Sequence, residues 1–336
     1  MASICKALLL AAGAVALSCS PVYAIEALVA PATKAGVFIG ASAGVPPPGI
    51  YMFNQVFTYQ SNLTGPGVAT ALGGNTHVGV QAAVDVQGFL FVPGWTFLGA
   101  TYDAVLVQPF VMQSFGSPIN VQEAGVHNTY FVPGELSWKL GDSGFAIKTG
   151  VGIYAPDGTV TGVAGTGNVG SPYWTFQPEV IVSYLKDGWN LSAAVYEEFN
   201  TRNSVSHYQS GDILHADFTA TKTIGKWTFG PVAYYYGQVS NDSCSANCAY
   251  ATGTLLNAQR FNVWAVGGLV GYDFGAAALS VWATEEVSAK ASNPAAVAAT
   301  GSDFSLVPQG FTVFGTLSYR LWAPEQPAAT PALYHK

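Results

Sequence analysis

The sequence predicts an all-β protein, a transmembrane antiparallel up-and-down β-barrel of about twelve strands. Three observations support this prediction. Apolar residues are abundant but dispersed, apolar and polar residues alternate with period two, and short turns alternate with long loops. These features are typical of strands that show one face to lipid and the other face to a lumen.

The composition argues against a soluble domain and against a bundle of membrane helices. Only 9% of the residues are charged and 50% are hydrophobic, whereas about 25% of the residues of soluble domains are charged. Beyond the first residues, no apolar run reaches the ~18 residues that a membrane helix requires. The net charge is −7, with 12 Lys and Arg, so nothing basic favours a nucleic-acid partner.

The first residues, 1–24, are typical of a secretory signal peptide. Lys6 precedes an apolar run, and Val22-Tyr23-Ala24 places small residues at the positions that a signal peptidase requires for cleavage after Ala24. A lipoprotein anchored through Cys19 is the alternative, although the residues before this cysteine fit a lipobox poorly. We therefore expect export and insertion into a bacterial outer membrane.

Three further segments follow the signal peptide. Residues 25–48 are mildly apolar and rich in Gly, Ala and Pro, so they either fold into the lumen as a plug or lie in the periplasm. Residues 49–322 are predicted to form the barrel. Residues 323–336 read APEQPAATPALYHK, a composition that predicts a disordered periplasmic tail.

The predicted strands are separated by gaps that alternate between long and short. Five gaps are tight-turn signals such as Pro93-Gly94 and Lys186-Asp187-Gly188. The long gaps are 62–76, 113–126, 156–172, 201–210, 241–259 and 290–308. Outer-membrane barrels place short turns in the periplasm and long loops outside the cell. The predicted strands are 49–61, 77–92, 95–112, 127–140, 144–155, 173–185, 189–200, 211–223, 226–240, 260–274, 277–289 and 309–322.

The alternation within the strands predicts which side chains line the lumen. In the segment 173–185, Trp174, Phe176, Val180 and Val182 fall on one face, while Glu179 falls on the other. Because the lumen of a small barrel is narrow, a few inward polar groups are expected to control permeation. The candidate lumen or solute-contact residues are Glu179, Tyr196, Glu198, Asn200, His215, Asp217, Glu286 and Arg320. The alternative is that these groups merely pair with one another across the interior.

Three other residues carry separate predictions. Pro178 removes a ladder hydrogen bond from an interior strand, so we expect a wall kink there. This kink is either harmless or a lateral exit for a hydrophobic solute. Cys244 and Cys248 lie in a short polar segment of an exported chain, which favours a local disulfide. A zinc site would need further ligands, and no histidine lies nearby, so no metal site and no cofactor are predicted.

Residues 173–218 carry a resemblance to a known family. Tyr173-Trp174-Thr175-Phe176 with Pro178, Gly188-Trp189, Phe199-Asn200 and Ser210-Gly211-Asp212 with His215 resemble the signature block of the outer-membrane family named for the meta-pathway of phenol degradation. The segments 46–51 and 271–274 resemble the start and a late strand of the same family. The resemblance implies a β-barrel channel that admits aromatic or other hydrophobic compounds.

The resemblance and the pattern together predict an outer-membrane channel for passive uptake of small hydrophobic or aromatic molecules. The expected partners are outer-membrane lipids, small hydrophobic solutes and the barrel assembly machinery. A structural or surface-interaction barrel with a closed lumen is the alternative from another class. A barrel hydrolase that uses His215 is a weaker one, since no G-x-S-x-G motif is present, and the protein is not expected to be an enzyme.

Overall fold

Twelve long antiparallel strands close into a ring in the computed structural model, which describes residues 31–71, 77–161, 168–244, 261–294, 297–298, 301–303 and 305–325. The first strand pairs with the last, and β2 pairs with both β1 and β4. The ring is formed by β1 (Gly49–Thr64), β2 (Gly79–Val92), β4 (Ala100–Phe115), β6 (Tyr130–Lys139), β7 (Phe145–Tyr154), β8 (Thr175–Tyr184), β9 (Trp189–Asn200), β11 (Ile213–Ile224), β12 (Trp227–Gln238), β14 (Phe261–Asp273), β15 (Ala277–Ala291) and β16 (Val307–Trp322). The predicted fold class and strand number are therefore confirmed.

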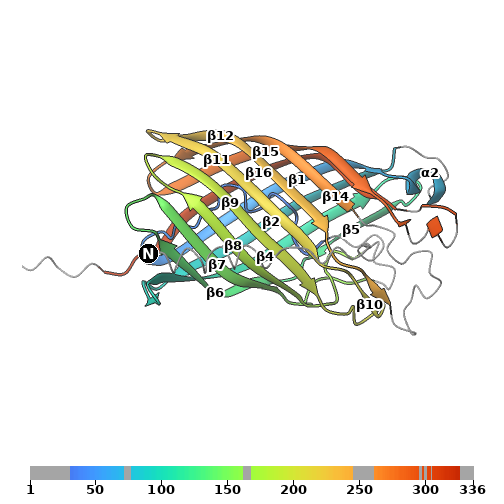
Figure 1. The fold of residues 1–336 in the computed structure, drawn as a ribbon, viewed down its shortest axis with the longest axis horizontal. Coiled ribbons are helices and arrows are strands. Elements are labelled where there is room, and N and C mark those ends of the chain that lie inside the picture. The colour runs from blue at the N-terminus through green and yellow to red at the C-terminus, as the bar shows by residue number, and fades with distance from the viewer. Residues whose placement is uncertain are drawn as a thin grey trace, which may run out of the picture.

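Short elements accompany the twelve long strands. They are α2 (Gly67–Ala71), β3 (Thr96–Phe97), β5 (Val121–Val126), β10 (Tyr208–Gln209) and β13 (Ser243–Cys244). Figure 1 shows the tilted strands of the barrel, with α2 and β10 together at one end. We name this end the loop end, and we name the opposite end, where the tight turns lie, the short-turn end. In the part of the chain that the structure describes, no helix is long and apolar enough to cross a membrane.

Several expected boundaries were wrong, and among the predicted loops, 62–76 contains α2 and 241–259 contains β13. The segment 95–112 is not one strand, because Leu98 and Gly99 adopt left-handed backbone conformations and form a turn between β3 and β4. The segments 113–126 and 201–210 are not wholly loops, because they contain β5 and β10. β5 extends the ladder of β4 at the loop end. Such extensions lack the lipid-facing alternation on which the sequence prediction depended.

The faces of β8 alternate as the sequence predicts. Phe176, Val180 and Val182 are exposed on the outer surface, whereas Thr175 and Glu179 are buried on the inner one. Because this outer face is apolar over the whole strand, it matches the hydrocarbon core of a bilayer.

Exposed aromatic residues on the outer surface lie near both ends of the strands. At the short-turn end they include Trp95, Phe97, Phe145, Trp189, Trp227 and Trp322. At the loop end they include Phe110, Trp174, Phe199 and Trp264. Two such girdles mark the two interfaces of a bilayer.

The strand register around Pro178 is continuous. Pro178 pairs with Val151 of β7. On the side of β9, the pairs Phe176–Phe199 and Glu179–Tyr196 stand in one register on either side of the proline. Register shifts occur instead between β4 and β6 near Asp103, between β6 and β7, between β14 and β15, and at the start of β1. No register shift therefore accompanies the wall kink predicted at Pro178, and a lateral exit there stays a prediction.

Candidate functional site

Residues 31–44, here called the plug segment, lie inside the barrel and bind its wall through their own backbone. The amides of Ala32 and Thr33 donate to the carboxylate of Glu198, at 3.2 Å and 2.8 Å. The Thr33 hydroxyl is 2.7 Å from the Tyr154 hydroxyl and accepts a bond of 2.6 Å from Gln177. Because Gln177 and Glu198 lie towards the loop end of β8 and β9, the plug segment reaches deep into the lumen.

The plug segment then descends along the same wall towards the short-turn end. The amides of Gly36 and Phe38 both donate to the Asp217 carboxylate, at 3.2 Å each. Further along, Gly40 donates to Thr219 at 2.9 Å and Ala43 donates to Ser183 at 2.8 Å. The wall side chains that accept these bonds are Glu198, Asp217, Thr219 and Ser183, which together with Gln177 we call the polar wall. An irregular segment has unpaired amides, and this wall satisfies them.

Apolar packing and backbone shape complete the fit of the plug segment. The Phe38 ring contacts Tyr196 edge-on, with ring centroids 5.1 Å apart, and Ala35, Ile39 and Ala43 are buried. Gly36 has a φ of +88°, and a Cβ atom there would lie 2.8 Å from the Tyr234 ring. Glycine is therefore required at position 36 for both its backbone conformation and its close approach to β12.

One ionic cluster joins the plug segment to the barrel. The Lys34 ammonium lies 3.0 Å from the Glu286 carboxylate. Glu286 also accepts hydroxyl bonds of 2.7 Å from Tyr59 and from Tyr234. The backbone amide of Gly310 donates to the same carboxylate at 2.8 Å. Glu286 thus has four donors around it, of which only Lys34 comes from the plug segment.

A second ionic cluster lies within the wall itself. The Lys148 ammonium is 3.0 Å from Asp103 and 2.7 Å from Glu135. All three side chains are buried and come from β7, β4 and β6. They lie beside the register shifts of these strands, so the charges of this cluster compensate one another at an irregular part of the wall.

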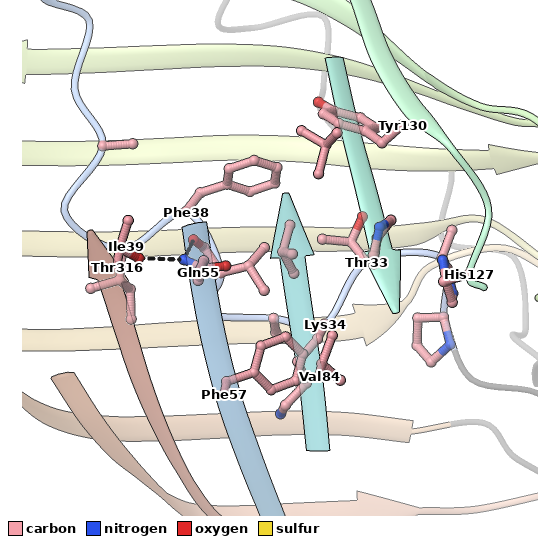
Figure 2. Close-up of a pocket in the computed structure, with 18 of the residues that line it drawn as sticks. Thr33, Lys34, Phe38, Ile39, Gln55, Phe57, Val84, His127, Tyr130 and Thr316 are labelled. Atoms are coloured by element: carbon pink, nitrogen blue, oxygen red, sulfur yellow. Dashed lines mark hydrogen bonds between the residues drawn. The ribbon is translucent and has the colours of Figure 1, made fainter. Parts of the chain in front are cut away.

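A cavity of about 790 Å³ lies between the plug segment and the opposite side of the barrel. Figure 2 shows Thr33, Lys34, Phe38 and Ile39 of the plug segment among the inward side chains Phe57 and Val84. Glu135, Lys148 and Glu179 line part of the cavity, so it is not wholly apolar. Its aliphatic and aromatic side, which we call the apolar wall, consists of Phe57, Val80, Val84, Val86, Val105, Val107 and Val111.

The structure buries seven of the eight predicted lumen residues inside the barrel. These are Glu179, Tyr196, Glu198, Asn200, His215, Asp217 and Glu286. Glu198, Asp217 and Glu286 hold the plug segment, and Glu179 lines the cavity. Arg320 instead lies exposed at the short-turn end, where its guanidinium donates to the Pro48 carbonyl and stacks over Tyr51. Contact of any of these residues with a solute stays a prediction.

His215 is fully buried and packed on both faces. Its ring stacks on Tyr196 and on Tyr236, with centroid distances of 5.0 Å and 5.8 Å. Its Nε2 atom lies 3.0 Å from Glu198. His215 therefore supports the carboxylate that binds Ala32 and Thr33, and we assign it a structural position behind the plug segment.

Four charged groups of the interior were not predicted from the sequence, one from an irregular segment and three from predicted strands. Lys34 could not be assigned, because residues 25–48 have no periodicity that fixes a side-chain direction. Asp103, Glu135 and Lys148 did carry a signal, since each is a charged residue within a predicted strand. A search for opposite charges on neighbouring predicted strands could have found that cluster.

The structure describes one of the two cysteines of the predicted disulfide. Cys244 lies in β13 and is disulfide-bonded, whereas Cys248 lies outside the described residues, so this pairing stays a prediction. Within the described ranges, no group of three or more His, Cys, Asp or Glu residues could hold a metal ion.

A closed antiparallel barrel with an apolar outer band, two aromatic girdles and buried polar and charged groups in its interior defines an outer-membrane β-barrel protein. The short-turn end is then periplasmic and the loop end is extracellular. The family model described as "Putative MetA-pathway of phenol degradation" matches residues 64–296. The chain belongs to this family, as the resemblance in residues 173–218 predicted.

The chain is similar to several solved structures at low sequence identity. An outer membrane channel from Pseudomonas putida F1 is 11% identical, with a TM-score of 0.66 over 85% of this chain and 99% of that chain. The translocator domain of the autotransporter NalP from Neisseria meningitidis is 10% identical, with a TM-score of 0.44 over 82% of this chain and 90% of that one. The β domain of the Bordetella autotransporter BrkA is 13% identical, with a TM-score of 0.43 over 81% of this chain and 100% of that one. No curated protein matches the chain.

Proposed function

We propose that the protein is a channel for passive uptake of small, hydrophobic or aromatic molecules across the bacterial outer membrane. The observation that carries this proposal is the cavity of about 790 Å³ between the plug segment and the apolar wall. Cavities of this size hold drug-sized ligands, and apolar lining with a few polar groups is typical of such sites. A monocyclic aromatic molecule fits this volume with room to move.

The asymmetry of the lumen supports a route along the apolar wall. The plug segment binds the polar wall through seven hydrogen bonds from or to residues 32–43, including those to Glu198 and Asp217. Fewer polar bonds reach the opposite side; one of them joins Gln55 to the Val37 carbonyl. A hydrophobic solute therefore passes with least disruption between the plug segment and the apolar wall, while the plug segment excludes larger and more polar molecules.

The family membership and the P. putida protein support the same proposal. The family description names phenol degradation, and the structure with the TM-score of 0.66 belongs to a protein described as an outer membrane channel. On this proposal the protein contacts outer-membrane lipids and small hydrophobic solutes and is inserted by the barrel assembly machinery. Residues 1–24 act as the cleaved signal peptide, and residues 323–336 act as a periplasmic tail.

The geometry gives the hydrolase alternative no support. A general base must reach the nucleophile and the substrate. His215 is fully buried between two tyrosine rings and lies against Glu198. This position serves the plug segment rather than an approaching ester, so we propose that the protein is not an enzyme.

Solute flux into liposomes tests the proposed function. Purified barrel is reconstituted, and the uptake of phenol, a medium-chain fatty acid and a hexose is compared with uptake by protein-free liposomes. We expect phenol to enter faster through the barrel and the hexose to enter at the background rate. Uptake of the hexose alone would overturn the proposal, and no uptake of any probe would favour the closed-lumen alternative.

A further inference from the structure

The barrel wall contains an aromatic cage that is occupied by an ammonium group of the chain itself. The Lys34 Nζ atom lies 4.3 Å from the ring centroid of Tyr59, 5.1 Å from that of Tyr234 and 5.7 Å from that of Tyr236. The Glu286 carboxylate, which is 3.0 Å away, neutralises its charge. The Lys34 ammonium also donates to the Tyr234 hydroxyl at 3.1 Å. Tyrosine rings around an ammonium with a carboxylate beside it form an arrangement that proteins use to recognise organic cations.

Every part of this cage except Lys34 belongs to the barrel. Tyr59 comes from β1, Tyr234 and Tyr236 come from β12, and Glu286 comes from β15. Without Lys34, Glu286 still accepts the Tyr59 and Tyr234 hydroxyls and the Gly310 amide. These bonds lie within the barrel and do not involve Lys34, which supports a preformed site rather than one built by Lys34.

The cage opens onto the cavity beside the apolar wall. Lys34, Tyr59 and Tyr236 line that cavity together with Phe57 and Val84. An ammonium group in the cage would thus place the rest of its molecule against aromatic and aliphatic side chains. This combination fits an amine whose nitrogen is protonated and whose body is apolar, and it fits neither an anion nor a sugar.

We propose that Tyr59, Tyr234, Tyr236 and Glu286 form a binding site for primary organic ammonium ions with an apolar or aromatic body, and that Lys34 occupies this site as an internal substitute while the lumen is plugged. An arriving amine and Lys34 compete for one site. By linkage, binding of the amine shifts the plug segment away from its closed position. The inference rests on the proposed function only for the route by which the amine arrives.

Equilibrium binding to the detergent-solubilised full-length barrel tests the site without any transport. Lys34→Met removes the ammonium but keeps an apolar stem, so the cage becomes free. We expect this variant to bind phenethylammonium about tenfold more tightly than the unsubstituted protein does, and about tenfold more tightly than it binds the neutral 2-phenylethanol, as a partly desolvated cation–π cage predicts. Titration calorimetry measures both affinities.

Two matched variants define the control. Lys186→Met removes an exposed lysine at a periplasmic turn and should leave the affinity for phenethylammonium as it is in the unsubstituted protein. Lys34→Met combined with Glu286→Gln should abolish the preference for the ammonium over the alcohol. Equal affinity of the Lys34→Met variant for both compounds, or an unchanged preference after Glu286→Gln, would overturn the inference.

A measurement on the unsubstituted protein keeps the inference testable if Lys34→Met does not fold. Saturating phenethylammonium should displace Lys34 and increase the deuterium labelling of the peptide that carries the Gly36 and Phe38 amides, which are bonded to Asp217 in the closed position, whereas 2-phenylethanol should not. Labelling that stays equal with both compounds would contradict the competition. Phenol flux into liposomes is recorded separately, so a channel that conducts phenol but fails both binding tests retains its proposed function and loses only the amine site.

Discussion

The inward faces of β8, β9 and β11 differ from those of β2 and β4. The first group presents Thr175, Gln177, Glu179, Ser183, Ser192, Glu198, Asn200, His215, Asp217, Thr219 and Thr221 to the lumen. The second group presents Val80, Val84, Val86, Val105, Val107 and Val111. The plug segment lies against the polar group, because an irregular segment must satisfy its backbone amides and the side chains of that group accept hydrogen bonds from them. The opposite side stays free, and the cavity forms there.

The outer faces of the same strands differ less than their inner faces do. On β8 the exposed side chains are Phe176, Val180 and Val182. On β2 they are apolar at Phe89 and Phe91 but also include Gln81 and Asp85, and Asp85 accepts a bond of 2.5 Å from Asn54 of β1. Strands β1 and β2 therefore carry part of their polarity outside and their aliphatic side chains inside. A barrel with two kinds of wall can hold a polar plug and an apolar passage at the same time.

Deletion of residues 25–44 should have the largest effect on this asymmetric lumen. Without the plug segment, the polar wall becomes hydrated and the free cross-section widens, so we expect single-channel conductance in planar bilayers to rise severalfold. A chain shortened after residue 325 is the control and should conduct as the full chain does. Equal conductance of the two shortened chains would show that the plug segment does not limit the passage of ions.

Asp217→Val should weaken the closed position of the plug segment without removing it. The substitution takes away two charge-assisted bonds, from the amides of Gly36 and Phe38. Each such bond contributes about 1.5–3 kcal/mol, so the fraction of time spent in a high-conductance state should rise at least ~10-fold. Asp217→Asn keeps one acceptor and should give an intermediate value. An equal high-conductance fraction in all three proteins would show that the bonds to Asp217 do not hold the plug segment in its closed position.

The opposite wall offers a test with a different readout. Val84→Asp places a carboxylate in the cavity, where burial of a charge is unfavourable, so we expect phenol flux into liposomes to fall about tenfold, a cost of roughly 1.4 kcal/mol. Val84→Ile keeps the wall apolar and should conserve most of the flux. Thr221→Asp, on the side of the polar wall, is expected to change phenol flux less than Val84→Asp does. A larger loss of phenol flux in Thr221→Asp than in Val84→Asp would show that the solute passes along the polar wall instead of the apolar wall.

The architecture could be predicted from the sequence, because strand periodicity and loop length depend only on local order along the chain. Glu198 and Asp217 were assigned to the lumen for this reason, and they are buried there. The role of these carboxylates could not be predicted, since it depends on Thr33 and Gly36 in a segment with no regular structure. The alternation of side chains along a strand also defines two faces without showing which of them meets lipid. The inward position of Val84 could therefore be assigned only from the closed ring of strands.

Pro178→Val should have the smallest effect, and it tests whether the barrel wall offers a second route. Pro178 faces outward, and pairing of β8 with β9 is interrupted beside it while the register is preserved. Valine supplies the N–H that proline lacks, so the free energy of unfolding should rise by at most ~1 kcal/mol, measured by urea unfolding in detergent. Phenol flux should not change, because the passage follows Val84 and Val107 on the other side of the barrel. A loss of phenol flux in the valine variant would instead make the interrupted pairing a lateral exit, and the apolar wall would then be only the approach to it.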